Sequence, residues 1–280
     1  MAWHFTSALV VLVLMEGCRF ACCSHDCIKA CEDLQAASLP ESSSSSSSAS
    51  AVICGWEEPD SYCKKPPISV RDVYEELWNN NLNIAKDILN LPFLQNMEKQ
   101  TLSPDVYSNF MMQDIYYAGQ VTNMLKKLSE TPGELQDFFK NRYNSYDKFL
   151  QTLLHDYNLK DVSCIKPIPA IKKYIDDYRE IMEKEEPIYF AVGLYPCARL
   201  WPFLANELKM DETNLYYKWK KDNIDGYYEK NYKDFLNKHL QSEEEIERAN
   251  KVFKQQILNE GEFFEASGQS GVERRRQGVR

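Results

Sequence analysis

The feature that most constrains the fold of this chain is a helical pattern that runs almost without a break from residue 69 to residue 267. Apolar residues recur along it at intervals of three and four, the spacing of one helix face, without a convincing two-residue alternation typical of strands. Glycine accounts for only 10 of 280 residues, few for the turns of a β-sandwich or a dinucleotide-binding sheet. The sequence therefore predicts an all-α protein.

Prolines, polar capping residues and the apolar period divide this stretch into about eight helices with short connections. Ser103 followed by Pro104, for example, predicts a helix start, and Thr131 with Pro132 and Gly133 predicts the end of that helix. The expected helices cover residues 69–90, 103–128, 134–155, 169–184, 187–208, 213–221, 226–239 and 242–264.

The N-terminal part of the chain has a different composition. An apolar run from Ala8 to Met15 is followed by small residues, which predicts a signal peptide over residues 1–21. The run is too short to span a bilayer, and no later stretch looks long and apolar enough. The predicted localisation is therefore secretion, with the cytoplasm as the alternative.

Seven of the 9 cysteines lie within the first 63 residues, which favours disulfides if the protein is secreted. Zinc binding is the alternative, because His25 lies among these cysteines, but the Cys-x-x-Cys pairs of common zinc modules are absent. No metal is expected. The serine run at residues 42–48 predicts a flexible linker. Because the count is odd, at least one thiol must stay outside intramolecular pairs, and Cys197 is the expected one.

These observations predict four parts: a signal peptide at 1–21, a Cys-rich and Ser-rich segment at 22–68, a helical domain at 69–267 and a disordered tail at 268–280. The net charge of -9 argues against a nucleic-acid partner, which would favour a basic chain. No membrane partner is expected either.

Three expected helices carry a polar or reactive side chain on an otherwise apolar face, where burial is costly without a partner or a function. Asp114 lies in line with Phe110 and Tyr117, Cys197 lies on an apolar stripe of the helix at 187–208, and Glu260 does so on the last helix. Each has a simpler interpretation, because a buried cysteine is usually a small hydrophobe. Together, a thiol and two carboxylates make a workable catalytic set.

Four short strings then resemble one known family. They are Gln-Asp-x-Tyr-Tyr at residues 113–117, Leu-Tyr-Pro-Cys at 194–197, Tyr-x-x-Trp at 216–219 and Glu-x-x-Phe-Phe at 260–264. Their order and content are similar to those of the TenA/thiaminase II family, over about residues 72–264. The resemblance implies a haem-oxygenase-like helical fold and an enzyme that acts on thiamine or its pyrimidine, without a cofactor.

The resemblance also implies roles for individual residues. Cys197 would be the nucleophile that attacks the pyrimidine ring, Asp114 would hydrogen-bond the ring's amino edge, and Glu260 would move protons. Tyr117, Tyr174 and Phe263 would wall the substrate pocket. The family's pocket tyrosine after Tyr-x-x-Trp falls on Asn223 here.

Other departures bear on the reaction. Ala198 replaces an aromatic residue that follows the family cysteine, and Phe264 replaces the closing tryptophan. Ordinary TenA proteins are cytosolic salvage enzymes, whereas a secreted relative looks more like an animal thiaminase. Such an enzyme passes the pyrimidine to an organic base (type I) or to water (type II). The implied partners are thus the small-molecule substrate and a nucleophilic co-substrate, and the family implies a homo-oligomer.

Alternatives remain open from the residues alone. Haem oxygenase shares the fold but needs a histidine near the start of the domain, and residues 69–128 contain none. A di-iron site needs Glu-x-x-His pairs, and neither His155 nor His239 has a glutamate three residues before it. An aminopyrimidine aminohydrolase of thiamine salvage and an inactive secreted helical binding protein are the further alternatives.

Overall fold

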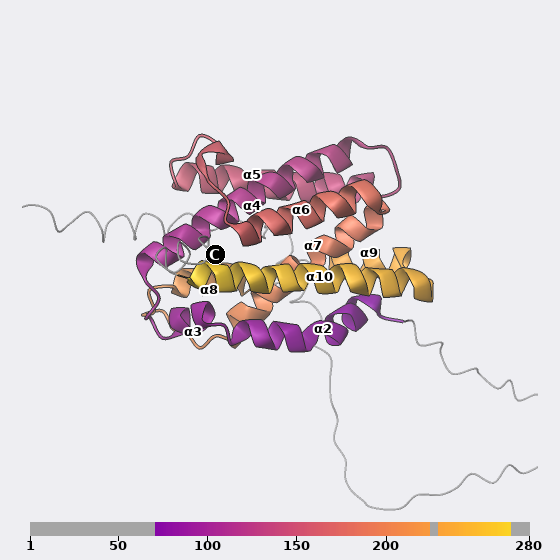
Figure 1. Cartoon of the computed structure of the whole chain (residues 1–280). Helices are drawn as coiled ribbons and strands as arrows, with labels where there is room; N and C mark the ends of the chain where they lie inside the picture. The colour runs from indigo at the N-terminus through magenta and orange to yellow at the C-terminus, as the bar shows by residue number, and fades with distance from the viewer. Residues whose placement is uncertain (1–70, 225–228, 270–280) are drawn as a thin grey trace, which may run out of the picture. The chain divides into compact units, whose positions relative to one another are not determined.

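The computed structural model describes residues 71–224 and 229–269 (Figure 1). Within these two ranges the chain forms nine α-helices and one 3₁₀ turn, with no strand, so the all-α prediction is confirmed. The elements are α2 (Val73–Leu89), α3 (Pro92–Glu98), α4 (Pro104–Glu130), α5 (Gln136–Asp156), η1 (Val162–Cys164), α6 (Pro169–Lys184), α7 (Pro187–Glu207), α8 (Tyr217–Asn223), α9 (Glu229–His239) and α10 (Glu243–Gly268).

Helix boundaries differ from the sequence-based expectation at several points. The sequence did not predict the short helix α3. It begins with Pro92 at its first position, and it is stabilised by the buried side chains of Phe93, Leu94 and Met97. Helix α2 begins at Val73 because the Asp72 side chain accepts a hydrogen bond from the backbone N–H of Glu75 at 3.3 Å. The capping residue is therefore Asp72 and not residue 69, which lies outside the described residues.

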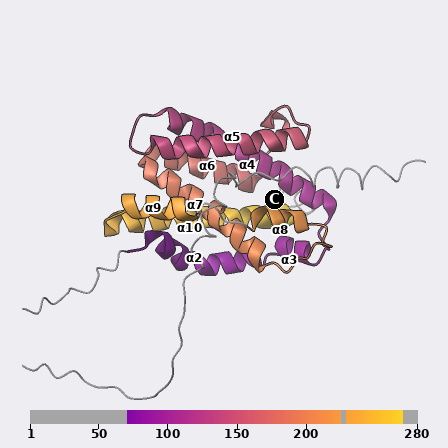
Figure 2. The ribbon, with the colours of Figure 1, turned by 180° about the vertical axis from the view of Figure 1, so that it is seen from behind.

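Helix α10 is the element against which most others pack. It contacts α2, α3, α4, α6 and α7, and Figures 1 and 2 show it running through the middle of the helices from opposite sides. Its start is fixed by a capping box in which Ser242 and Glu245 satisfy each other's backbone N–H groups. Helices α4 and α5 form an antiparallel pair, and α4 also packs on α6. This arrangement brings the inner faces of α4, α7 and α10 together.

Helix α7 is the most apolar element of the bundle. Among the described residues it alone is long and apolar enough to cross a membrane, so the expectation that no later stretch would pass that test was wrong. In the structure, 67% of its most apolar window is buried, as in a core helix. Pro196 and Pro202 lie inside it and lack the N–H that would bond the preceding turn. Packing against the neighbouring helices therefore stabilises α7 more than its own backbone hydrogen bonds do.

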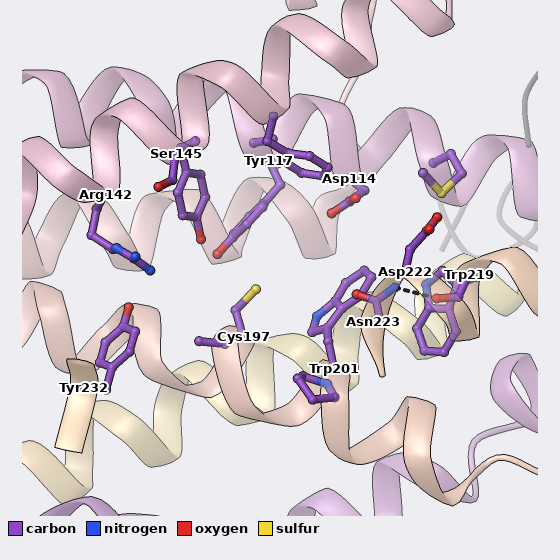
Figure 3. A pocket seen from close by; sticks show the side chains of 16 residues that line it. Asp114, Tyr117, Arg142, Ser145, Cys197, Trp201, Trp219, Asp222, Asn223 and Tyr232 are labelled. Atoms are coloured by element: carbon purple, nitrogen blue, oxygen red, sulfur yellow. Dashed lines mark hydrogen bonds between the residues drawn. The ribbon is translucent and has the colours of Figure 1, made fainter. Parts of the chain in front are cut away.

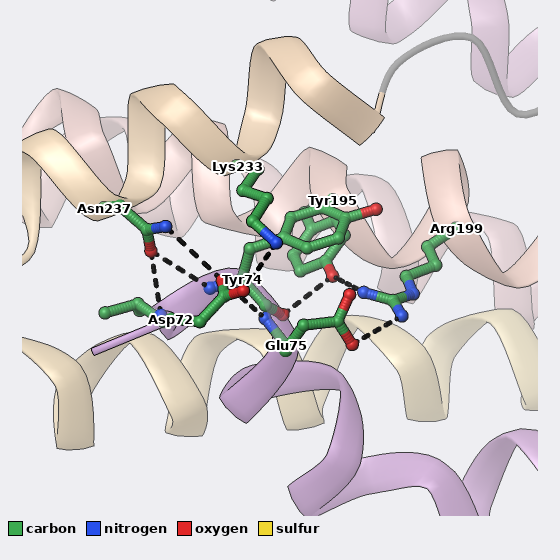
Figure 4. Close-up of polar contacts among 8 residues, drawn as sticks. Asp72, Tyr74, Glu75, Tyr195, Arg199, Lys233 and Asn237 are labelled. Carbon is green, nitrogen blue, oxygen red and sulfur yellow. Dashed lines mark hydrogen bonds and ion pairs between the residues drawn. The ribbon is translucent and has the colours of Figure 1, made fainter. Parts of the chain in front are cut away.

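A polar network ties α7 to α2 and α9 (Figure 4). The Arg199 guanidinium donates to the Tyr195 hydroxyl at 2.7 Å and to the Glu75 carboxylate at 2.9 Å, and Tyr195 donates to the backbone carbonyl of Tyr74 at 2.9 Å. On the α9 side, Asn237 accepts from the N–H of Val73 at 2.8 Å. Because Tyr195 and Arg199 flank Cys197 in the chain, these contacts fix the position of the cysteine.

Helices extend from Val73 to Gly268. The expected signal peptide at 1–21, the Cys-rich segment at 22–68 with its disulfides, and residues 270–280 of the expected tail lie outside the described residues. Both described cysteines, Cys164 and Cys197, are free.

Candidate active site

A cavity of about 140 Å³ opens between α4, α5, α7, α8 and α9 (Figure 3). A closed engineered cavity of about 150 Å³ holds one benzene molecule, so this open cavity has room for at least one six-membered ring. Most of the wall is aromatic or aliphatic, and a few polar groups reach it, as in small-molecule sites. The lining residues are Met111, Asp114, Tyr117, Ala118, Arg142, Ser145, Tyr146, Phe149, Cys197, Ala198, Trp201, Pro202, Trp219, Asp222, Asn223 and Tyr232.

Asp114 reaches the cavity from the middle of α4, where only 9% of its surface is exposed. Burial raises the pKa of its carboxyl to about 7, and the negative charge of Glu260 acts in the same direction. Near neutral pH this side chain therefore exists partly as a carboxylic acid. In that form it offers one hydrogen-bond donor and one acceptor.

Cys197 faces the cavity from α7, directly after Pro196. Burial raises the pKa of its thiol well above the usual value, and the charges of Glu260 and Asp114 raise it further. The resting side chain is therefore a thiol. Because a thiolate is the reactive form, this cysteine needs a neighbouring base to become a nucleophile.

Glu260 supplies such a base from α10. It is 1% exposed and lies behind the cavity wall, where Tyr174 donates to one carboxyl oxygen at 2.8 Å and the Trp201 indole donates to the other at 3.2 Å. Burial raises its pKa to about 7, against the opposite effect of hydrogen bonds from Tyr174, Trp201 and Cys197. Its carboxylate thus stays available near neutral pH to accept a proton from Cys197.

The two raised carboxyl pKa values make stability depend on pH in a defined direction. Asp114 and Glu260 bind protons more tightly in the folded protein than in the unfolded chain, so their stabilising contribution is present below pH 4 and lost as pH rises to about 7. We expect urea denaturation to give a lower free energy of unfolding at pH 8 than at pH 5, by on the order of 3 kcal/mol per carboxyl. In the Asp114→Asn, Glu260→Gln double variant, the free energies of unfolding at pH 5 and pH 8 should lie closer together. An unchanged difference between them would contradict the raised pKa values of the two carboxyls.

A pair of tyrosines sets the direction of hydrogen bonding beside the thiol. Tyr178 donates its only hydroxyl proton to the carbonyl of Gly193 at 2.9 Å, so its oxygen accepts from the Tyr117 hydroxyl at 3.0 Å. The Tyr117 hydroxyl also lies within hydrogen-bonding reach of the Cys197 sulfur. The Tyr178 oxygen and the Cys197 sulfur therefore compete for the Tyr117 proton, and a hydrogen bond from Tyr117 to the sulfur lowers the pKa of the thiol.

Removal of the Tyr178 hydroxyl should therefore free the proton of Tyr117. In the Tyr178→Phe variant we expect that proton to bond the sulfur, which favours the thiolate and lowers the pKa of Cys197 by roughly one unit. The pH dependence of Cys197 alkylation by iodoacetamide, followed by peptide mass spectrometry, measures this. Tyr189→Phe, on α7 but outside the cavity, is the matched control. A pKa that rises or stays the same in Tyr178→Phe would refute the bonding pattern.

The other predicted site residues lie at different depths. Asn223 lines the cavity, and its amide donates to the Trp219 carbonyl at 2.8 Å. Tyr174 is 1% exposed and acts through Glu260, its hydrogen-bond partner. Phe263 is buried and stacks on Phe110, with ring centroids 4.9 Å apart, so it supports the wall from behind. Of the seven predicted residues, Asp114, Tyr117, Cys197 and Asn223 line the cavity itself.

Sequence reasoning missed the contribution of α5, of Trp219 and Asp222 on α8, and of Tyr232 on α9. Arg142, Ser145, Tyr146 and Phe149 line the cavity at spacings of three, four and seven, which put them on one helix face. A buried arginine on that face was the available signal. Trp219 gives a further sign of a ligand: its indole N–H is buried and has no hydrogen-bond partner among the described residues.

No protein-family model matches the sequence, and no curated protein matches it significantly. Solved structures do match the fold. Haem oxygenase-1 from the cyanobacterium Synechocystis sp. PCC6803, in complex with haem, aligns with a TM-score of 0.52 at 14% identity, over 75% of this chain and 97% of its own. The protein thus has the haem-oxygenase-like helical fold.

Within that class, TenA homologues are also similar. One from P. horikoshii OT3 aligns with a TM-score of 0.61 at 18% identity, over 70% of this chain and 98% of its own. Another, from Pyrococcus furiosus, aligns with a TM-score of 0.59 at 21% identity, over 70% of this chain and 99% of its own. The chain has the fold of the TenA homologues, as the four sequence motifs predicted.

The cavity does not fit a haem group. Neither described histidine, His155 nor His239, lines it, so the proximal histidine of a haem oxygenase has no counterpart there among the described residues. Among the residues that the structure describes, no group of three His, Cys, Asp or Glu side chains is arranged to hold a metal ion.

Proposed function

We propose that the protein is a thiaminase, which displaces the thiazolium of thiamine from the pyrimidine methylene through Cys197. The observation that carries the proposal is the position of Cys197 and Asp114 on the wall of one cavity, with the buried base Glu260 behind that wall, each from a different helix. The structural likeness to TenA homologues supports a thiamine-related substrate.

The pyrimidine ring would lie with its amino edge on Asp114. As a carboxylic acid, Asp114 donates to a ring nitrogen and accepts from the adjacent amino group, a two-point match to an aminopyrimidine. Its raised pKa makes this form accessible near neutral pH. The aromatic wall, which includes Tyr117 and Tyr146, excludes water from the ring and fixes its plane.

The first half of the reaction transfers one proton and exchanges two bonds. The Glu260 carboxylate takes the thiol proton of Cys197, and the sulfur adds to the ring carbon beside the one that bears the methylene. The electron pair displaced by this addition moves onto the ring nitrogen that accepts a hydrogen bond from Asp114, and that hydrogen bond stabilises the charge. The bond between the methylene and the thiazolium nitrogen then breaks, and its electron pair leaves with the neutral thiazole.

The second half restores the enzyme. A nucleophile, either an organic base or water, forms a bond to the methylene, and the electron pair returns through the ring and breaks the carbon–sulfur bond. The thiolate recovers its proton from Glu260, whose carboxylate then takes any surplus proton from the nucleophile. Overall, thiamine and the nucleophile become the substituted pyrimidine and the thiazole, with one proton released when the nucleophile carries one.

This scheme predicts a bell-shaped pH profile with its maximum near pH 7. Activity falls on the acid side as Glu260 gains a proton and on the alkaline side as Asp114 loses one, since both pKa values lie at about 7. In Asp114→Asn, whose amide still offers a donor and an acceptor, we expect kcat/KM at pH 7 within about tenfold of wild type and no alkaline limb from this residue. Asp114→Leu should lose roughly 10²-fold or more. An alkaline limb that persists in Asp114→Asn would contradict this role.

Incubation of the purified protein with thiamine, with and without pyridine or aniline, tests the function. We expect thiamine loss with release of the thiazole in equal amounts. Loss that requires the added base identifies a type I transferase, and loss in water alone identifies a type II hydrolase. No loss in either condition would contradict the proposal.

The same site also supports a salvage aminohydrolase. The observation that favours it is the similarity to TenA homologues. An aminomethylpyrimidine that releases ammonia faster than thiamine releases its thiazole would favour this second function. If both substrates bind without turnover, the chain is a binding protein.

Secretion and assembly belong to the same proposal. We expect the expressed protein in the culture medium, with a new N-terminus near residue 22 and paired cysteines in the Cys-rich segment. N-terminal sequencing and size-exclusion chromatography test cleavage and a homo-oligomer. An intact N-terminus on a cytoplasmic protein would contradict secretion.

A further inference from the structure

One end of the cavity differs from the rest in its chemistry. Trp201 from α7 and Trp219 from α8 line it with indole rings whose centroids lie 5.7 Å apart at an angle of 40°. Figure 3 shows Cys197 between this end, which also holds Asp222, and the opposite end with Arg142 and Tyr232. A group attached to a pyrimidine beside Cys197 can therefore extend toward the two tryptophans, away from the arginine.

The Trp219 side chain carries an unsatisfied donor at this end. The residue is 4% exposed, and its Nε1–H has no hydrogen-bond partner among the described residues. A buried N–H without an acceptor is costly, and such groups normally have a partner. An acceptor oxygen on a bound molecule would satisfy it.

The charges at this end favour a cation. Asp222 lines the cavity, and Lys218 at 3.0 Å balances its charge. Asp114 and Glu260 add negative charge whenever either is ionised. Two indole faces also attract a flat cation, because their π-electrons carry partial negative charge.

We propose that Trp201 and Trp219 form the subsite for the leaving ring, a flat aromatic cation bearing a hydroxyl whose oxygen accepts from Trp219 Nε1–H. For thiamine this is the hydroxyethyl-thiazolium half, so the inference rests on the proposed function and extends it to a residue that recognises the leaving group. Trp219 is a specificity-determining residue in this account, since it contacts the part of the substrate that departs.

Binding to the Cys197→Ala protein tests the subsite without turnover. Isothermal titration would compare thiamine with an analogue that carries ethyl in place of hydroxyethyl, in the parent and with Trp219→Phe added. We expect the parent to bind thiamine about tenfold tighter than the ethyl analogue, and Trp219→Phe to bind the two equally, because phenylalanine keeps a ring but has no N–H. No preference in the parent, or the same preference in Trp219→Phe, would overturn the assignment.

Two further ligands complete the experiment. A methylated aminopyrimidine without the second ring should bind both proteins equally, which shows that Trp219→Phe leaves the fold and the pyrimidine site intact. An analogue with an uncharged thiophene in place of the thiazolium should bind the parent several-fold more weakly than thiamine. Equal or tighter binding of the thiophene analogue would overturn the cation site.

The outcomes separate the two proposals. Turnover of thiamine by the wild type without the hydroxyl preference contradicts only the subsite. Absence of turnover with the preference present contradicts only the thiaminase. If none of the ligands binds, both are contradicted.

Discussion

Replacement of Cys197 with alanine is expected to lower kcat/KM for thiamine by at least about 10³-fold. The variant loses the thiol that forms the covalent bond to the ring, while the volume change is small. Steady-state thiamine consumption at pH 7, with product analysis, measures the effect. Circular dichroism and the titrations of the aminopyrimidine show whether the fold and the cavity are retained.

Cys164→Ala is the matched control for this variant. Cys164 is the other cysteine that the structure describes, and it is free and exposed at η1, outside the cavity. We expect this variant to keep wild-type activity. Activity of Cys197→Ala above about a tenth of wild type would refute the nucleophile.

Replacement of Glu260 with glutamine is expected to have the second-largest effect, a loss of about 10²- to 10⁴-fold in kcat/KM, the usual contribution of a general acid–base group. Glutamine keeps the shape of the side chain but cannot accept the thiol proton. Its amide nitrogen also leaves one of the two donors, Tyr174 or Trp201, without an acceptor. The residual activity of this variant should no longer fall on the acid side of the pH profile, because that fall reports protonation of Glu260.

The thiol gives an independent measurement of the same residue. The charge of Glu260 is one of the causes that raise the pKa of Cys197, so Glu260→Gln should lower that pKa in alkylation experiments. Glu262→Gln, two residues along α10 and paired with Lys173 at 3.0 Å on the exposed face, is the control and should change neither quantity. Full activity of Glu260→Gln would contradict its role as the base.

Much of the fold was predictable because the signals are local. Proline at the start of α4, α6 and α7 and the capping box of α10 mark helix ends that depend on a few neighbouring residues. Helix α3 escaped prediction because it has seven residues, too few for the apolar period to appear. The start of α2 depends on the Asp72 side chain and its contacts with α9, which are 165 residues away in sequence.

The candidate site was predictable only where a polar side chain interrupts an apolar stripe. Asp114, Cys197 and Glu260 have that signature, and the motif resemblance assigned their roles. The depth of each residue could not be predicted, because it depends on how helices pack. Phe263 and Tyr174 are predicted wall residues that in fact stand behind the cavity, whereas the tryptophans at its far end were not singled out.

Protection of Cys197 from alkylation tests the central claim most directly. The claim is that the aminopyrimidine of thiamine binds against this thiol. Wild-type protein would be treated with iodoacetamide at pH 9 with increasing amounts of a methylated aminopyrimidine, which lacks a leaving group, and the Cys197 and Cys164 peptides would be quantified in the same digest. We expect saturable protection of Cys197 and an unchanged rate at exposed Cys164. Alkylation of Cys197 at the same rate with and without saturating pyrimidine would contradict the account.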